Sequence, residues 1–406
     1  MSPPSSPGAP AGSADDLASG FDHNDHAMRA RCAEVYGTLR RACPVFHSEE
    51  WGGFWVASRY EDVYEVGRDI ERFVSAPGVM LPPVGHGRPL LPMESDPPEH
   101  PAYRELLLPR FAPAAVAALE DDIRALAREL VDEIADRGRA DVYEQLCKPL
   151  PLLMITQLLG VERDDEFWEW TDTLMYGRVQ GISQERILEV AGELYAFLGR
   201  EVEKRRARPG DDLISLLLQG TVDGRPYREP EMLDLCFFLL IAGLENTGFG
   251  IRATLRHLAV RPDHRAAVLA DPSLVHNAVE QSLRLYSPVT ALCRTAAEDT
   301  EVNGQHIRAG ERMLLLFGSA NRDETVFEDA DEFHLERRDG RHVAFGIGPH
   351  RCDGSHLARL EMRIAVEEFL RRVPDFRLAP GPDPGWYAAS ALELEWDVDG
   401  RNGGGA

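Results

Sequence analysis

A run of residues near the C-terminal end of the chain has the composition of a metal-binding loop. It reads Phe345-Gly-Ile-Gly-Pro-His-Arg-Cys352-Asp-Gly354. Its glycines allow the backbone to turn tightly and to approach a flat ligand. Cys352 comes just before a helix predicted to begin near Ser355, where N–H groups and the helix dipole favour a thiolate. A lone cysteine is usually an inert buried thiol, but the residues around this one favour a soft-metal ligand, and haem iron is a standard user.

A second set of polar residues interrupts a long apolar helix. Pro230 and Pro262 fit the start and the stop of a helix of about 32 residues. Its first half is apolar nearly all round, as in a helix that crosses the centre of a protein. Gly243, Glu245 and Asn246 break this pattern. A buried acid is rare without a partner or a task, although an N-cap or an exposed turn would explain the same residues.

The elements that would position these residues are mostly helices. Helical periodicity runs through most of residues 115–285, whereas short strand-like segments lie at 53–57, 301–302, 313–316 and 392–396. The proline-rich residues 75–101 form an irregular loop, and such a loop inside a compact domain is usually functional. We predict an α+β fold, mainly α with small peripheral β-sheets, in a single domain over residues 19–400. Residues 1–18 read as a disordered tail and 401–406 as a flexible one.

Charge and composition exclude several classes of protein. The 406 residues include 44 Lys and Arg against 68 Asp and Glu, a formal net charge of −24. This argues against a nucleic-acid partner, because a phosphate backbone needs a basic surface. The longest uncharged hydrophobic run, residues 235–244, is shorter than the roughly 18 residues of a membrane span. The six cysteines lack paired or metal-binding spacing. With no secretion signal recognisable, we expect no membrane association and a cytoplasmic location.

The run that ends at Gly354 resembles the cysteine-ligand loop of the cytochrome P450 family, F-G-x-G-x-H-x-C-x-G. Leu357-Ala358-Arg359 with Glu361 resembles the helix that follows this loop in the family. A dinucleotide-binding glycine motif is excluded, because Arg351 occupies its last glycine position.

The resemblance extends over nearly the whole chain and matches the soluble bacterial branch of the family in length. Ala320-Asn321-Arg322-Asp323 resembles the segment that precedes the ligand loop. Asp96-Pro-Pro-Glu-His100 with Arg104 resembles the start of the third helix, and residues 242–245 resemble the oxygen-binding part of the central helix.

The resemblance implies haem b as the cofactor and Cys352 as the axial thiolate that pushes electron density onto the iron. It also implies that Phe345 packs near the thiolate and that Glu245 supplies protons. Four side chains would pair with the two haem propionates: His100, Arg104, Arg294 and His350. For each of these four, a plain surface charge is the alternative.

Two positions depart from the family pattern. Threonine normally follows the acid of the central helix, but here Asn246 follows Glu245 and Thr247 comes one residue later. Thr247 cannot simply substitute, because one residue is a 100° turn of the helix. An amide can hold a water or a substrate oxygen, which favours an oxygenated substrate. The family's Glu-x-x-Arg has Gln281 in place of its acid, and Gln281 can still accept a hydrogen bond from Arg284.

The implied activity is that of a haem-thiolate monooxygenase that hydroxylates or otherwise oxidises an apolar small molecule, such as a terpenoid or another natural-product scaffold. Electrons would come from separate ferredoxin and ferredoxin reductase chains, because the sequence has no flavin or iron–sulfur segment. The basic candidates for docking the donor are Arg104, Arg110, Arg351 and Arg359. The alternatives are coupling, dehydration or peroxide-driven chemistry, and a non-catalytic haem-fold helper, which Cys352 disfavours.

Apolar and aromatic segments would line the substrate pocket, although each such residue could equally be plain core. The pocket candidates are Val79, Leu81, Leu240, Gly243, Val289, Leu292 and Trp386.

Overall fold

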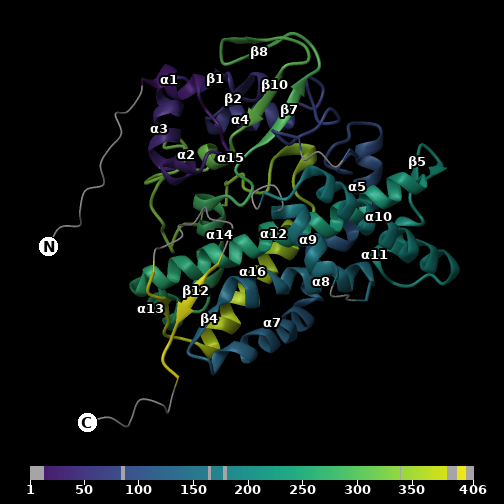
Figure 1. Cartoon of the computed structure of the whole chain (residues 1–406). Helices are drawn as coiled ribbons and strands as arrows, with labels where there is room; N and C mark the ends of the chain where they lie inside the picture. The colour runs from purple at the N-terminus through teal and green to yellow at the C-terminus, as the bar shows by residue number, and fades with distance from the viewer. Residues whose placement is uncertain are drawn as a thin grey trace.

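Helices form most of the computed structural model, which describes residues 13–83, 87–162, 166–176, 181–338, 340–381 and 391–398 (Figure 1). The helices are α1 (Ala14–Ser19), α2 (His26–Ala30), α3 (Cys32–Ala42), α4 (Tyr60–Arg68), α5 (Glu99–Phe111), α6 (Pro113–Ala117), α7 (Glu120–Ala135), α8 (Pro149–Leu159), α9 (Glu166–Tyr176), α10 (Gln184–Ala207), α11 (Leu213–Leu217), α12 (Glu229–Val260), α13 (Pro262–Ala270), α14 (Leu274–Tyr286), α15 (Phe317–Ala320) and α16 (Ser355–Arg372). Shorter helical turns are η1 (Glu50–Gly52), the π-helical η2 (Tyr143–Cys147) and η3 (Gly348–His350).

The strands form small sheets at the periphery, so the predicted fold class is confirmed. Their bounds are β1 (Val45–Ser48), β2 (Phe54–Ala57), β3 (Phe73–Val74), β4 (Arg139–Asp141), β5 (Thr221–Val222), β6 (Arg225–Pro226), β7 (Leu292–Ala296), β8 (Thr300–Val302), β9 (Gln305–Ile307), β10 (Arg312–Leu315), β11 (Arg377–Leu378) and β12 (Glu393–Glu395). The largest sheet has the order β1-β2-β10-β7-β3, and a second has the order β11-β12-β4. In Figure 1 the larger sheet lies beside α1 to α4, away from most of the long helices.

The register of the larger sheet decides what faces the protein interior. Strand β10 runs parallel to β2 and antiparallel to β7, and Arg294 of β7 lies opposite Met313 of β10. Arg294 is buried although it carries a charge. A buried guanidinium in a small sheet needs polar partners, because burying an unpaired charge is costly.

Helix α12 runs through the centre of the helical part (Figure 1). Among the described residues it is the one helix long and apolar enough to cross a membrane, but 59% of its most apolar window is buried inside the protein. Its neighbours approach closely at two glycines. A Cβ on Gly248 would lie 2.8 Å from the carbonyl oxygen of Cys147, and one on Gly250 would lie 2.2 Å from Cε of Met362. These contacts hold α12 against η2 and α16.

Helix α16 is fastened to α7 by a group of ion pairs around one buried acid. Glu368 is 1% exposed and accepts from Arg124, Arg128 and Arg371 at 2.8, 3.0 and 2.8 Å. These guanidinium groups hold the pKa of Glu368 at about 2 against the opposing effect of burial. Such a network fixes α16, whose other end follows Cys352.

The first described helix lies inside the range expected to be a disordered tail. Helix α1 begins at Ala14, and Ser13 caps it. The Ser13 side chain accepts from the Asp16 N–H at 3.1 Å, while Asp16 Oδ2 accepts from the Ser13 N–H at 3.1 Å. This reciprocal capping box stabilises a short helix that composition alone does not indicate.

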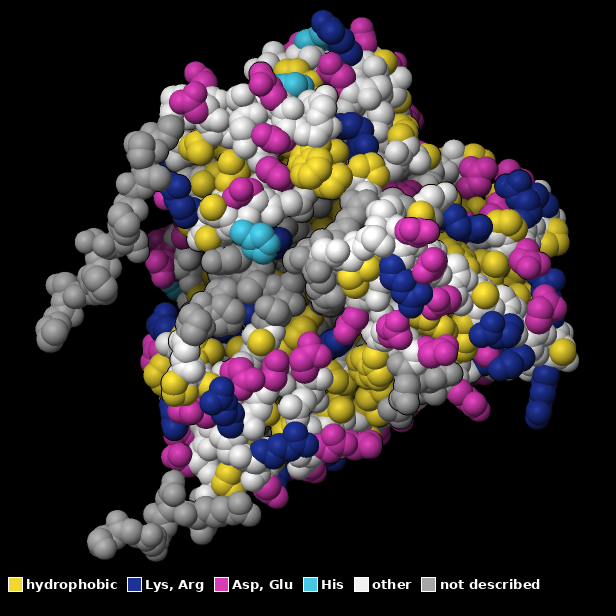
Figure 2. Space-filling model, in the orientation of Figure 1, with side chains coloured by type: hydrophobic (Ala, Val, Ile, Leu, Met, Phe, Trp, Pro, Cys, Tyr) yellow, Lys and Arg dark blue, Asp and Glu magenta, His cyan; other side chains and the backbone are white. Residues whose placement is uncertain are grey.

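Figure 2 shows acidic and basic side chains mixed over the face in view, with no continuous basic area there. This distribution accompanies the net charge of −24. The face in view therefore does not offer the extended basic area that a phosphate backbone requires.

Candidate active site

The loop that ends at Cys352 depends on two glycines. Gly346 and Gly348 have φ values of +72° and +66°, a region that other residues rarely adopt. Gly348 also packs on the end of α4, where an added Cβ would lie 2.8 Å from the carbonyl oxygen of Gly67. The Cys352 N–H donates to the Phe345 carbonyl at 2.8 Å. The predicted tight turn is therefore present, and Gly348 brings the loop close to the backbone of α4.

Cys352 is an exposed residue at the end of the loop. Burial of the thiol, followed by the nearby Asp353, raises the pKa of Cys352, while the Gly354 N–H, Arg104 and Arg351 lower it. A bound metal cation reverses this preference, because a coordinating thiol is deprotonated. In the described part of the chain, no group of three or more His, Cys, Asp and Glu side chains could hold a metal. A metal at Cys352 would therefore need its remaining ligands from a cofactor.

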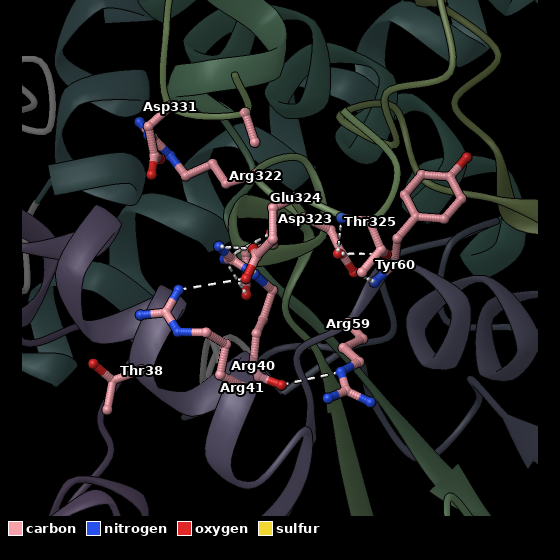
Figure 3. Close-up of polar contacts among 12 residues, drawn as sticks. Thr38, Arg40, Arg41, Arg59, Tyr60, Arg322, Asp323, Glu324, Thr325 and Asp331 are labelled. Atoms are coloured by element: carbon pink, nitrogen blue, oxygen red, sulfur yellow. Dashed lines mark hydrogen bonds and ion pairs between the residues drawn. The ribbon is translucent and has the colours of Figure 1, made fainter. Parts of the chain in front are cut away.

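Helix α4, on which the loop rests, is itself held by Asp323. Its Oδ2 atom accepts from the Tyr60 N–H at 2.8 Å, and Oδ1 accepts from the Thr325 hydroxyl at 2.7 Å. Figure 3 shows Asp323 between Thr325 and the start of α4, with the Arg40–Glu324 ion pair beside it. Asp323 is 2% exposed. Asp323 therefore caps the N-terminus of α4. The side chain of the N-cap residue itself, Arg59, forms no capping hydrogen bond.

Asn321 connects the loop to α14. Its Oδ1 atom accepts from the Val343 N–H at 2.6 Å, just before the loop. Its Nδ2 atom donates to Ser287 Oγ at 2.9 Å, directly after α14. Asn321 is fully buried. The segment 320–323, which the sequence singles out, therefore holds both the loop and the helix beneath it.

Four predicted side chains meet beside the loop. The rings of His100 and His350 lie with their centroids 3.9 Å apart. His350 Nε2 is 3.2 Å from Ser75 Oγ, and Asp96 holds Ser75 in place by accepting its N–H at 2.8 Å. Burial, followed by the positive charges of Arg104 and Arg294, lowers the pKa of His100 to about 4 and that of His350 to about 2.

This cluster has unused hydrogen-bond capacity. His100 Nε2 is buried and has no hydrogen-bond partner. Arg294 is 4% exposed, and its side chain donates to the Cys293 carbonyl at 2.7 Å. Among the described residues no carboxylate forms an ion pair with Arg294, and burial lowers its pKa to about 10. A buried guanidinium with no ion-pair partner among the described residues, beside a buried imidazole nitrogen with an unused hydrogen-bond site, is an arrangement that an anionic group would satisfy.

The middle of α12 is not fully buried. Residues 241–243 and 245–246 are partly exposed, whereas the helix on the C-terminal side is buried from Thr247 to Leu255. Glu245 and Asn246 therefore present accessible side chains, and Thr247, 5% exposed, does not. The predicted difference in direction between Asn246 and Thr247 agrees with this burial.

The pocket candidates divide into two groups. Gly243, Val289 and Leu292 are partly exposed, as residues that border a pocket must be. Val79 and Leu240 are 0% exposed, and Leu81 is 9% exposed. Leu240 packs in the main hydrophobic core, and its place in the pocket stays a prediction. A helix that is apolar all round gives no periodicity to separate core from pocket. Trp386 lies outside the described residues.

A sequence model described as Cytochrome P450 matches residues 183–384. A steroid C26-monooxygenase of Mycolicibacterium smegmatis is 35% identical over 370 residues, covering 90% of this chain and 90% of the relative. The chain belongs to the cytochrome P450 family. A linalool 8-monooxygenase of Pseudomonas putida is 34% identical over 85% of this cytochrome P450 and 89% of its own length.

Solved structures agree with this family. The structure of CYP109E1 from Bacillus megaterium in complex with testosterone has a TM-score of 0.82 to this P450 and 31% identity. The superposition covers 92% of this chain and 100% of the CYP109E1 chain. The chain is a bacterial-type cytochrome P450 monooxygenase of apolar substrates, and its cofactor is haem b.

The residues of this P450 fit haem. Cys352 offers one sulfur ligand, and Arg294 and the orphaned Nε2 of His100 offer buried hydrogen-bonding groups to carboxylates. The altered Glu-x-x-Arg motif also holds together. Gln281 Oε1 accepts from Nε and Nη2 of Arg284 at 3.2 and 3.0 Å, which confirms the predicted hydrogen bond. Arg284 is fully buried and also donates to the carbonyls of Asn321, Ala330 and Glu332.

Three contacting residues were not predicted from the sequence. Asp353 forms an ion pair with Arg104 at 2.5 Å, Ser75 contacts His350, and Glu280 pairs with Arg359. No fixed position of the family motifs quoted above coincides with any of the three. Glu280 carries the one available signal, because a charged residue beside a motif position is expected to find a partner when it is buried.

Proposed function

We propose that this P450 oxidises an apolar small molecule that already carries an oxygen atom, such as a terpenoid alcohol or a steroid-like natural product. The observation that carries the proposal is the pair Glu245 and Asn246, which are both partly exposed while Thr247 is buried. An amide offers two N–H donors and one acceptor, which suits a hydroxyl or carbonyl oxygen. The compounds named for the compared relatives, steroids, linalool and testosterone, support this class.

Haem supplies the oxidation when it is bound: one atom of O2 enters the substrate and the other leaves as water, with two electrons and two protons consumed. Cys352 would ligate the iron through its sulfur. His100, Arg104, Arg294 and His350 would hold the propionates in a region that excludes water. Phe345 would cover the sulfur and limit its access to water.

Glu245 would supply protons, and Asn246 would orient the water or the substrate oxygen that receives them. An amide cannot pass a proton on as a hydroxyl does. A water or a substrate hydroxyl must therefore complete the path that begins at the Glu245 carboxyl. An asparagine at position 246 therefore favours a substrate that carries a hydroxyl group or leaves room for an ordered water.

The test compares coupling of NADH consumption to product for matched substrates with and without a hydroxyl group. We expect Asn246→Ala to release more hydrogen peroxide with the hydroxylated substrate, and Glu245→Gln to slow turnover more severely, because it removes the proton source. Asn246→Thr should lessen the dependence on the hydroxyl. Unchanged coupling in Asn246→Ala would show that Asn246 only stabilises the helix. Turnover with added peroxide in place of O2 and reductant would favour peroxide-driven chemistry instead. Turnover that needs no oxidant would favour dehydration, and O2 consumption with no oxygen atom in the product would favour oxidative coupling.

We further propose a ferredoxin as the electron donor, docked beside the Cys352 loop in the cytoplasm. The structure changes the choice of docking residues. Arg104 and Arg359 are 16% and 20% exposed and hold Asp353 and Glu280, so they act inside the protein. Arg110 pairs with Asp211 at 2.5 Å.

One of the four candidates, Arg351, and a further arginine, Arg68, are better placed for docking. Arg351 is exposed within the loop, and Arg68 is exposed at the end of α4, where Gly348 packs. Neither forms an ion pair with the described residues. We expect Arg351→Glu and Arg68→Glu to slow reduction by ferredoxin more strongly at low salt. Arg110→Glu is the control, because Arg110 lies ten residues along α5 from His100. Equal reduction rates in all variants would exclude this docking face.

A further inference from the structure

We propose that Glu280 is the positioning residue of the Cys352 loop in this chain, and that its carboxylate fastens the two sides of the loop to α14. It lies directly before Gln281, the neutral residue at the acidic position of the family motif. Glu280 is the only acidic residue in α14. The proposal goes beyond the substrate and donor proposals, and it does not depend on either of them.

The first contact of Glu280 is with the helix that follows the loop. Oε1 accepts from Arg359 Nε at 2.6 Å, and Oε2 accepts from Arg359 Nη2 at 3.1 Å. The two side chains are 14% and 20% exposed. A two-bond fork between a guanidinium and a carboxylate fixes direction as well as distance. The fork therefore holds the first part of α16, the helix that follows Cys352, against α14.

The second contact is with the segment that precedes the loop. His342 Nε2 lies 2.9 Å from Oε2 of Glu280, and the His342 side chain is 3% exposed. The Ala344 N–H donates to His342 Nδ1 at 3.3 Å. Since Nδ1 accepts, Nε2 carries the hydrogen that Glu280 receives. One carboxylate thus orients an imidazole that holds the backbone just before Phe345.

The third step reaches the cysteine. The Arg359 guanidinium carbon lies 4.3 Å from the centroid of the Phe345 ring, a cation–π contact. The Phe345 carbonyl accepts the Cys352 N–H at 2.8 Å. Glu280 therefore acts on Phe345 through Arg359 and through the His342 segment. Both routes end at the residue whose backbone holds Cys352.

Gln281 does not duplicate this role. One residue is a 100° turn of the helix, and Gln281 faces the buried Arg284 instead of α16. The network around Arg284 is built from an amide and main-chain carbonyls. The carboxylate of α14, that of Glu280, therefore lies on the side of the helix that faces the Cys352 loop.

The test uses the haem-loaded enzyme and follows how fast its reduced carbon monoxide complex loses the red-shifted absorption that reports a thiolate ligand. Glu280→Gln keeps the shape of the side chain and removes its charge. We expect it to lose the thiolate signal roughly tenfold faster than the unmodified enzyme, as fits the loss of charge-assisted hydrogen bonds. Glu280→Asp should lie between the two.

Glu368→Gln is the matched control, because Glu368 is also a buried, arginine-bound acid and lies at the far end of α16 from the loop. It should lower Tm without faster loss of the thiolate signal. The double variant Glu280→Gln with Gln281→Glu should remain fast, because a carboxylate at 281 faces Arg284.

Three outcomes would overturn the role of Glu280: an unchanged rate in Glu280→Gln, an equal acceleration in Glu368→Gln, or full recovery in the double variant. An unmodified enzyme with no red-shifted absorption would instead contradict the assignment of Cys352. If Glu280→Gln fails to fold, Arg359→Lys, which keeps the charge but loses the fork, is predicted to give the same acceleration.

Discussion

The Nη2 atom of Arg104 lies 2.5 Å from Oδ1 of Asp353 and joins α5 to the residue directly after Cys352. The two side chains are 16% and 14% exposed. The contact is an ion pair without hydrogen-bond alignment, because Asp353 Oδ1 is buried and has no hydrogen-bond partner. Burial raises the pKa of Asp353 to about 6, although Arg104 lowers it. Arg104 therefore keeps donors for a second anion, such as a haem propionate.

This arrangement predicts that Asp353 competes with the propionates for Arg104. We expect Asp353→Asn to slow the transfer of haem to an acceptor protein several-fold, because the whole guanidinium charge then serves the propionate. Arg104→Gln should speed the same transfer. Faster haem loss in Asp353→Asn would mean that the ion pair supports the site instead of competing with it.

Arg294 predicts opposite effects in the two states of the protein. It is a buried guanidinium with no ion-pair partner among the described residues. We expect Arg294→Met to stabilise the haem-free protein by about 1–3 kcal/mol, the cost of an uncompensated buried polar group. The same change should weaken haem retention. Urea unfolding of the haem-free protein measures the first effect, and haem transfer to an acceptor protein measures the second. A variant in which the stability of the haem-free protein and the retention of haem both rise, or both fall, would contradict the assigned role.

The buried His257 predicts an acid-sensitive stability. It stacks on Phe333 with ring centroids 3.5 Å apart and lies 2.9 Å from His264 Nδ1 through its Nε2 atom. Burial, followed by the His264 charge, lowers the pKa of His257 to about 3. The unfolded chain has a histidine pKa of about 6.5 and binds more protons, so stability is complete above that pH and declines below it.

We expect the free energy of unfolding to fall as the pH decreases from 7 to 4.5, above the range in which carboxylates add their own effect. In His257→Gln the slope of the free energy of unfolding against pH should be smaller, by the equivalent of up to one bound proton. Circular dichroism should show that the variant keeps the same fold. An identical slope in the variant would show that His257 does not titrate between the two states.

Glu368 predicts a different pH range and a larger loss. Its pKa is lowered to about 2 by three arginines, so its contribution is present above about pH 4.5 and declines as the pH falls toward 2. At pH 7, Glu368→Gln should reduce the free energy of unfolding by roughly 2–4 kcal/mol, because three guanidinium groups lose their shared charge. Denaturant unfolding measures this, and a loss below the error of extrapolation would contradict it.

Much of the site was predictable because backbone requirements leave a direct trace in the sequence. Gly346 and Gly348 have the positive φ values that their loop needs, and the helix expected between Pro230 and Pro262 is α12, Glu229–Val260. The strands at 53–57 and 313–316 correspond to β2 and β10 for the same reason: short apolar segments bounded by turn residues are recognisable locally.

Other features were not predictable because they depend on distant partners. Strand β7 was not recognised, since Leu-Cys-Arg-Thr-Ala places the buried Arg294 where alternation would suggest an exposed side chain. The Arg104–Asp353 and Glu280–Arg359 pairs join residues 249 and 79 positions apart. The packing of Leu240 in the main core could not be predicted, because every side of that helix segment is apolar.

The measurement that tests the central claim most directly is the absorption spectrum of the reduced carbon monoxide complex. With Cys352 as the axial thiolate, the purified enzyme should show a strongly red-shifted Soret band, and Cys352→His or Cys352→Ala should abolish it while haem remains detectable. A Soret band typical of histidine ligation in the unmodified protein, or a red-shifted band that persists in Cys352→Ala, would contradict the assignment of Cys352 as the haem ligand.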